Sequence, residues 1–168
     1  MKKIVLIFCC IFLAKLSAVS GPVETQPVGM VDGKTRCPVC GMFVARYQQW
    51  LTQMVMADGK TEAFDGVKDM MAYYFSPDQF GGPTDVTASR IFVKDYYSQT
   101  WIDGRKAFYV IGSDVYGPMG HELIPFNTRD AAENFLKDHH GRQIFPFFEI
   151  SAELIKALRK GQTMKGMN

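Results

Sequence analysis

Residues 60–75 read KTEAFDGVKDMMAYYF, and residues 122–137 read ELIPFNTRDAAENFLK. When Phe64 is set against Phe126, each stretch has an aromatic residue, a short polar residue and then the apolar face of a helix. The pairs that follow along the helix are Met70 with Ala132, Tyr73 with Phe135, and Tyr74 with Leu136. The sequence therefore predicts two copies of one strand–strand–helix–strand unit. A chance likeness between two ordinary helix starts remains the alternative.

The segments around the first stretch complete this unit. The apolar-rich run 50–56 ends in the turn signal Ala-Asp-Gly-Lys at 57–60, and this pattern predicts a hairpin with a return strand over 60–64. We expect Asp65 to cap a helix that ends before Pro77. Further strands are predicted over 90–97 and 100–102.

The second half repeats the order. It predicts strands over 106–111, 122–126 and 143–150, a turn over 116–120, and a helix from Asn127 to about Gly141. Ser151 should cap a last helix that runs to about Lys160. The fold class expected is α+β, with two similar ββαβ units in tandem, antiparallel or mixed sheets with one helix each, and a C-terminal helix. We place the first unit at 37–103, the second unit with this helix at 104–160, and a loose tail at 161–168.

The N-terminus has the pattern of a secretory signal. Lys2 and Lys3 precede the apolar run 4–14, which is too short to span a bilayer, and the small residues Ala18 and Ser20 suit cleavage before residue 21. We therefore assign 1–20 as a signal peptide and the polar, Pro- and Gly-dotted stretch 21–36 as a flexible tether. Membrane tethering, by an uncleaved leader or by lipid on a cysteine within it, stays open.

Composition excludes one large class of function. The chain has 168 residues, of which 47% are hydrophobic and 21% charged, as is usual for a globular protein. Its formal net charge of +2 becomes −1 without the leader, which leaves 16 basic and 17 acidic residues. Such a chain lacks the basic surface that nucleic-acid binding requires.

The stretch CPVCGM at 37–42 is the strongest chemical signal. A thioredoxin-like disulfide needs a strand before the two cysteines and a helix after them, whereas here a polar segment precedes and a glycine follows. A structural zinc site needs a second ligand pair, but no other cysteine follows the leader, and His139 and His140 are adjacent. A soft-metal site needs thiolate and thioether, which Cys40 and Met42 supply. A disulfide or free thiols without a role remain the bland alternative.

A second soft-ligand signal is GPMGH at 117–121. Met119 lies in a turn between glycines, where neither a helix nor a sheet claims its side chain, and His121 follows two residues later. Methionine and histidine complete the ligand types that Cu(I) prefers. Taken alone, either residue would more simply pack in a turn or lie in solvent.

These motifs together carry a family resemblance. An exported chain with Cys-Pro-Val-Cys-Gly-Met (37–42), Asp-Gly-Lys (58–60), Phe-Asp-Gly (64–66) before a Met-rich helix, and Pro-Met-Gly (118–120) resembles the nitrous oxide reductase accessory proteins of the NosL type. The resemblance implies two similar ββαβ domains. It also implies a periplasmic Cu(I)-binding chaperone of denitrification, without catalysis of its own, that supplies copper to apo-nitrous oxide reductase or its maturation machinery.

The resemblance also indicates copper ligands. Cys40 and Met42 match the Cys-Gly-Met element, and Met119 matches the Pro-Met-Gly element. We add His121 for its chemistry, and Cys37 as a further ligand, a spare ligand during transfer or a disulfide partner of Cys40. The alternatives are an exported thiol–disulfide oxidoreductase that uses the two cysteines, and a zinc-binding structural module.

Overall fold

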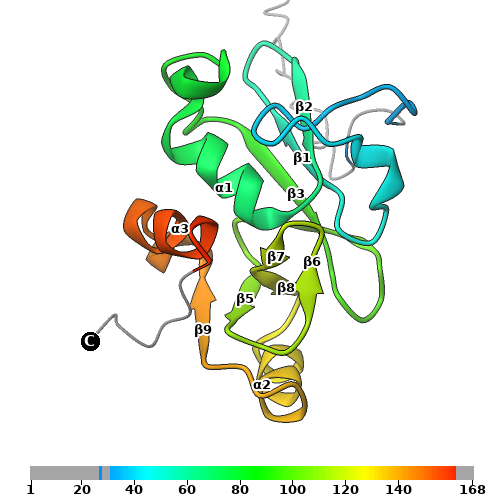
Figure 1. Cartoon of the computed structure of the whole chain (residues 1–168), viewed down its shortest axis with the longest axis vertical. Helices are drawn as coiled ribbons and strands as arrows, with labels where there is room; N and C mark the ends of the chain where they lie inside the picture. Colours follow the sequence, from blue (N-terminus) through cyan, green and yellow to red (C-terminus); the bar gives the residue numbers. More distant parts are fainter. Residues whose placement is uncertain (1–26, 28–30, 162–168) are drawn as a thin grey trace, which may run out of the picture.

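The computed structural model describes residue 27 and residues 31–161 (Figure 1). The predicted leader, most of the predicted tether and residues 162–168 lie outside this part. No helix within the described residues has both the length and the apolar character of a membrane span.

A four-stranded antiparallel sheet forms the first half of the fold. Its strands lie in the order β2-β1-β3-β4, and the central hairpin pairs Thr52 with Phe64 and Val55 with Thr61. Helix α1 packs on this sheet and buries Met70, Met71 and Tyr73 completely or nearly so. The elements of this half are β1 (Thr52–Val55), β2 (Thr61–Phe64), α1 (Val67–Phe75), β3 (Arg90–Lys94) and β4 (Trp101–Asp103), with short 3₁₀ helices η1 (Val44–Arg46) and η2 (Pro77–Phe80).

A three-stranded antiparallel sheet, in the order β8-β5-β9, forms the second half. Helix α2 packs on it through Ala132 and Phe135, both fully buried. The elements are β5 (Phe108–Ile111), β6 (Tyr116–Gly117), β7 (Gly120–His121), β8 (Ile124–Phe126), α2 (Arg129–Asp138), β9 (Gln143–Pro146), the 3₁₀ helix η3 (Phe147–Glu149) and α3 (Ala152–Arg159).

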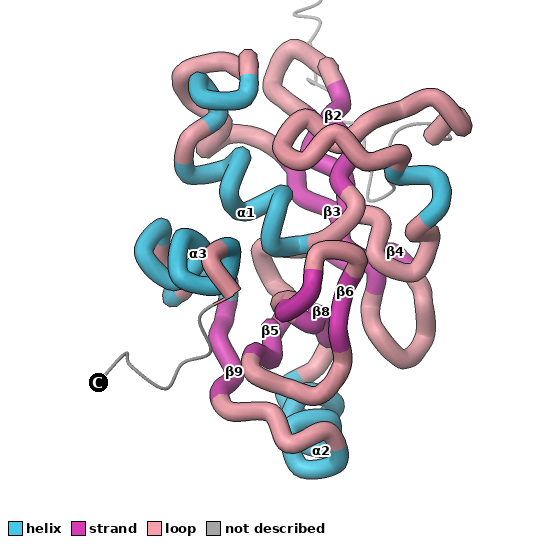
Figure 2. Tube along the Cα trace, viewed as in Figure 1, coloured by secondary structure: helices cyan, strands magenta, loops and turns pink. Residues whose placement is uncertain are grey.

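The two sheets share one connectivity. In each half the first strand is central, the second strand pairs on one side, and the strand after the helix pairs on the other. The halves differ by β4, which has no counterpart in the second sheet, and by the small β6–β7 hairpin, which forms in the region predicted as a turn (Figure 2). The predicted α+β fold class is confirmed.

The C-terminal helix crosses between the halves. It follows the second sheet in sequence but packs against α1, burying Leu154, Ile155 and Leu158 (Figure 1). Its predicted cap is correct, since the Ser151 hydroxyl accepts a hydrogen bond from the Leu154 N–H. Our division into units at 37–103 and 104–160 stays a prediction.

The predicted helix caps need correction. Gly66, not Asp65, is the residue before α1, and Thr128, not Asn127, caps α2 by accepting from the Ala131 N–H. At α1 the Lys68 N–H instead donates to a Glu122 carboxylate oxygen at 2.6 Å. A residue 54 positions away therefore satisfies a free N–H of this helix terminus, which the local sequence could not reveal.

A pair of buried tyrosines gives a test of one buried hydrogen bond of the fold. The Tyr109 hydroxyl donates to the buried Gly104 carbonyl at 2.6 Å, whereas the Tyr73 hydroxyl has no hydrogen-bond partner among the described residues. We expect Tyr109→Phe to lower the free energy of unfolding by about 1–3 kcal/mol, because it leaves a buried carbonyl unpaired. Tyr73→Phe, the matched control, should cause little or no loss in the same urea titration. Equal losses in the two variants would contradict this assignment.

Candidate metal centre

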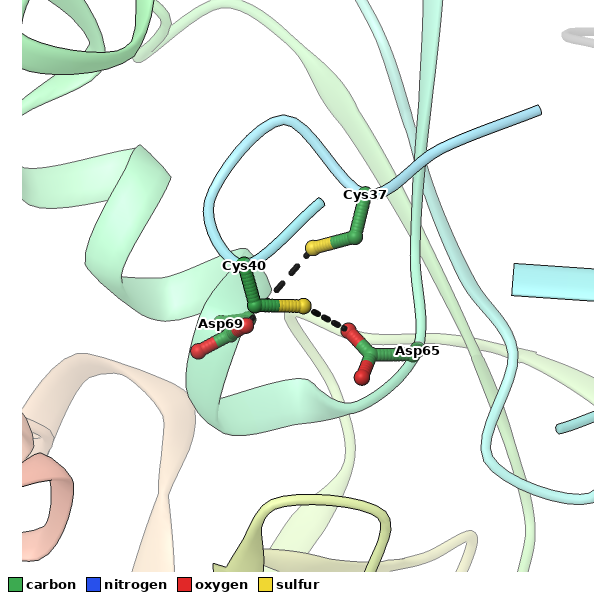
Figure 3. A group of neighbouring side chains, drawn as sticks. All are labelled: Cys37, Cys40, Asp65 and Asp69. Carbon is green, nitrogen blue, oxygen red and sulfur yellow. Dashed lines mark hydrogen bonds between the residues drawn. The ribbon is translucent and has the colours of Figure 1, made fainter. Parts of the chain in front are cut away.

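The stretch CPVCGM folds into a closed turn at the start of the described chain. The Gly41 N–H donates to the Cys37 carbonyl at 2.9 Å, and the Cys37 N–H donates to the Met42 carbonyl at 2.8 Å. Gly41 has a φ of +77°, a left-handed conformation that glycine adopts without strain. The turn thereby brings both thiols to the N-terminal end of α1 (Figure 3).

Four side chains meet there, and we call them the thiol–carboxylate cluster: Cys37, Cys40, Asp65 and Asp69. One ligand atom from each lies within 4.8 Å of all the others. The Cys40 thiol donates to Asp65 at 3.2 Å, and the Cys37 thiol donates to Asp69 at 3.6 Å. The two cysteines are free thiols, and all members of the cluster are buried except Cys40, which is half-buried.

Burial holds the thiols in their protonated form. It raises the pKa of Cys40 to about 12, and the adjacent Asp69 and Asp65 carboxylates add to this rise. Burial also raises the pKa of Cys37 far above its ordinary value, and it raises that of Asp69. A metal ion that binds these sulfurs must therefore displace their protons.

The cluster has an unsatisfied acceptor. Asp65 is 1% exposed, and its Oδ2 atom has no hydrogen-bond partner within the described part of the chain. A buried carboxylate oxygen without a partner is costly, and a bound cation would compensate it. Two sulfurs and two carboxylates at this spacing can hold a metal ion.

The β6–β7 hairpin lies at the same end of α1. The Lys68 ammonium, on the second residue of this helix, donates to the carbonyls of Met119 at 2.7 Å and His121 at 2.6 Å. Glu122, just after the hairpin, accepts from the Lys68 N–H. These bonds connect the hairpin to the residue beside Asp69.

This contact also explains the glycine of the Phe64-Asp65-Gly66 element. A Cβ atom at Gly66 would overlap the buried Glu122 carboxylate. Any larger residue at this position would therefore force the Glu122 carboxylate to move.

The structure gives each expected ligand a position. Cys37 and Cys40 belong to the cluster, and Met42 is half-buried at the end of the same turn. Met119 is 48% exposed at the tip of the β6–β7 hairpin. The His121 ring stacks at a tilt on Tyr116, with ring centroids 4.9 Å apart. The two loops thus meet the same helix end, although no direct contact joins Cys40 and Met119 among the interactions described.

Sequence reasoning missed the two carboxylates. Asp65 was interpreted as a helix cap, and Asp69 was not singled out. Their spacing of four residues, which stacks two side chains on one face at a helix start, was the available signal. Only the fold shows that this face is the one that meets the cysteines.

Comparison with known proteins decides the family. The sequence model of the NosL family matches residues 27–155. The chain belongs to the NosL family. The resemblance drawn from the motifs is thereby confirmed.

The sequence identity to individual NosL proteins is low, between 21% and 32%. The copper-binding lipoprotein NosL of Stutzerimonas stutzeri is 26% identical over 139 residues, which make up 78% of this chain and 69% of that protein. That of Achromobacter cycloclastes is 32% identical over 98 residues, or 55% of this chain and half of that protein. The crystal structure of the copper chaperone NosL from Shewanella denitrificans shares the fold, with a TM-score of 0.63 and 21% identity over 77% of this chain and 98% of that one. These NosL relatives are named for copper binding rather than for catalysis.

The site geometry weighs against the redox alternative. No strand leads into Cys37 over the described residues 31–36, and the residues after Cys40 form a turn and the 3₁₀ helix η1 rather than an α-helix. Reactive thiols of oxidoreductases have lowered pKa values, whereas burial raises the pKa of both cysteines here. The arrangement suits the binding of a cation better than thiol exchange.

Proposed function

We propose that this protein is a Cu(I) chaperone of the periplasm. The observation that carries the proposal is the thiol–carboxylate cluster, formed by the CPVCGM turn in a chain whose relatives are named for copper binding. Thiolate and thioether sulfur are the ligands that select Cu(I) over harder cations. The relatives' designation as lipoproteins, together with the apolar N-terminal stretch, supports export and attachment to a membrane.

The proposed ligands are Cys40, Met42, Met119 and His121. Cys40 is the more accessible of the two thiols, and Met42 is two residues away on the same turn. Met119 is offered by a hairpin whose backbone is tied to the helix that carries Asp69. Cys37 is 1% exposed, and we assign it as a spare ligand that binds during transfer.

The carboxylates have a separate task. The Cys40 thiol proton already points at Asp65. When copper takes the sulfur, Asp65 is the nearest acceptor for the departing proton. Once Asp65 has passed this proton on to solvent, one proton has been exchanged for one monovalent ion, so the net charge of the buried cluster is unchanged and loading requires no further compensating group.

The partial exposure of the proposed ligands fits a carrier. Cys40 and His121 are half-buried and Met119 is exposed, so an incoming ligand of a partner protein can reach the ion. We infer that the partner is apo-nitrous oxide reductase or its maturation machinery, and that the protein performs no catalysis itself.

Oxidation gives the experiment that tests this function. The affinity for Cu(I) should be high with reductant and lost after the two cysteines are oxidised to a disulfide, because the disulfide removes the thiolate. A competition titration with a colorimetric Cu(I) chelator measures both states. Reduction of the oxidised sample should restore binding. Equal affinities before and after oxidation would contradict Cys40 as a ligand.

The pH dependence of the Cu(I) affinity should show how many thiols lose a proton when copper binds. Because the pKa of Cys40 is raised to about 12, its thiol stays protonated at neutral pH, and copper must displace the proton. The affinity should therefore rise with pH, by about tenfold per pH unit between roughly pH 7 and 9 for one displaced proton. We expect one displaced proton rather than two, because Cys37 is the more deeply buried thiol and should keep its proton when copper binds Cys40.

The same titration of Cys37→Ser is the control and should give an unchanged slope. The affinity of the unchanged protein would instead rise by about one hundredfold per pH unit if both thiols were ligands in the loaded state. In that case Cys37→Ser should show a rise of only about tenfold per unit. An affinity independent of pH would contradict thiolate binding altogether.

A further inference from the structure

A groove opens between helix α3, the C-terminal half of α1, and η2. Its volume is about 500 Å³, and its lining combines apolar and cationic side chains. Phe75, Phe80 and Ile155 supply large apolar surface, and the two phenylalanines are only half-buried. Figures 1 and 2 show α3 beside α1, on the side of this helix away from the CPVCGM turn.

The charge of the groove has one sign. Lys156, Arg159 and Lys160 line it from the end of α3, and no acidic side chain is among its lining residues. Cations in the last turn of a helix interact favourably with the helix dipole, which accounts for part of this clustering of positive charge. The same argument does not account for aromatic surface left half-exposed beside them. The acids that interact with these cations are Glu153 on α3, which interacts with Lys156, and Asp69 on α1, whose Oδ1 atom lies 3.9 Å from Arg159.

Arg159 connects the groove with the thiol–carboxylate cluster. Its Nε atom lies 3.9 Å from Asp69 Oδ1, and the other oxygen of Asp69 accepts from the Cys37 thiol. A molecule that occupies the groove up to Arg159 is therefore separated from the cysteines by the single side chain of Asp69.

We propose that this groove is the docking site of the copper-receiving partner, which enters it with an acidic segment that carries a large apolar side chain. The proposal rests on the proposed function, since it gives the chemistry of the partner that this function requires. Carboxylates of the segment bind Lys156, Arg159 and Lys160, and the apolar side chain packs on Phe75 and Phe80. Opposite charges across such a surface speed association and orient the partner before copper moves.

The test uses a defined acidic peptide, acetyl-Glu-Glu-Asp-Phe-Leu-Glu-Asp-amide, titrated into the copper-free protein and followed by ¹⁵N NMR. The expected result is a set of shift changes confined to α1, η2 and α3, which weaken as salt is added. The charge-reversal variant Lys156→Glu with Lys160→Glu should reduce the affinity by about tenfold or more.

The matched control reverses two exposed lysines elsewhere, Lys106→Glu and Lys137→Glu. Lys137, like Lys156, is in the last turn of its helix. This control should leave peptide binding unchanged. Shift changes on other elements, or equal losses in the two double variants, would overturn the proposal. So would binding of phosphatidylglycerol vesicles through the same lysines without peptide binding, which would assign the groove to a membrane surface.

Copper affinity measured on the same variants separates this proposal from the proposed function. Lys156→Glu with Lys160→Glu should bind Cu(I) as the unchanged protein does. Loss of peptide binding with full copper binding supports the groove. Full copper binding with no peptide binding by the unchanged protein overturns the groove and leaves the chaperone function standing.

Discussion

Replacement of Cys40 by serine is expected to lower the affinity for Cu(I) by more than about 100-fold, since even the loss of groups that only support metal ligands costs 10- to 100-fold. Cys40 is the more accessible thiol of the CPVCGM turn and the only one we assign as a permanent ligand. A serine hydroxyl is a hard, neutral donor, and Cu(I) prefers soft, polarisable sulfur. The measurement is a competition titration against a Cu(I) chelator under reducing conditions.

Two controls make the result specific. Met54→Leu replaces a fully buried methionine of β1, outside the cluster, and should leave the affinity unchanged. Cys37→Ser should reduce it far less than Cys40→Ser, because we assign Cys37 only to transfer. Unchanged binding in Cys40→Ser would contradict the ligand assignment. Greater loss in Cys37→Ser would reverse the roles of the two thiols.

The second large effect concerns the attachment of the hairpin. Lys68 is 2% exposed, and its ammonium donates to the carbonyls of Met119 and His121. It also lowers the electrostatic cost of the buried Glu122 carboxylate. Lys68→Met should reduce the free energy of unfolding by about 3–5 kcal/mol, because it leaves a buried charge and two carbonyls uncompensated.

The same substitution should weaken copper binding, because it frees the hairpin that offers Met119. A urea titration and a copper titration measure the two effects. Lys94→Met is the matched control: this ammonium bonds to Gln99 and lies over the Trp101 ring, on the β3–β4 side of the first sheet. It should leave copper binding intact. If Lys68→Met proves too unstable to purify, Gly66→Ala perturbs the same contact through Glu122 and should lower the affinity too. A folded variant of either kind with full copper affinity would contradict the role of the hairpin.

The elements of the fold were predictable because their signals are local. The turn Asp58-Gly59 between apolar runs indicated a hairpin, and the apolar face with Met70 and Tyr73 indicated a helix on a sheet. The cap of α1 was wrong because Glu122, from the other half, satisfies its N–H. Long-range bonds of this kind leave no local pattern.

The candidate site was predictable only in part for the same reason. The CPVCGM motif marks both thiols in the sequence, and the structure places both of them in the cluster, while their role as copper ligands stays a prediction. Asp65 and Asp69 were missed because an acid at a helix start has an ordinary explanation in the helix dipole. The assignment of Met119 and His121 as ligands remains a prediction. The fold brings their backbone carbonyls, through hydrogen bonds from Lys68, to the helix end where the thiols lie.

X-ray absorption at the copper edge tests most directly whether one Cu(I) ion is shared by the CPVCGM turn and the β6–β7 hairpin. We expect about three sulfur neighbours and about one nitrogen neighbour, from Cys40, Met42, Met119 and His121. Met119→Leu should remove one sulfur from this shell and leave the thiolate in place. A shell that Met119→Leu does not alter would contradict the account, because the ion would then be held by the turn alone.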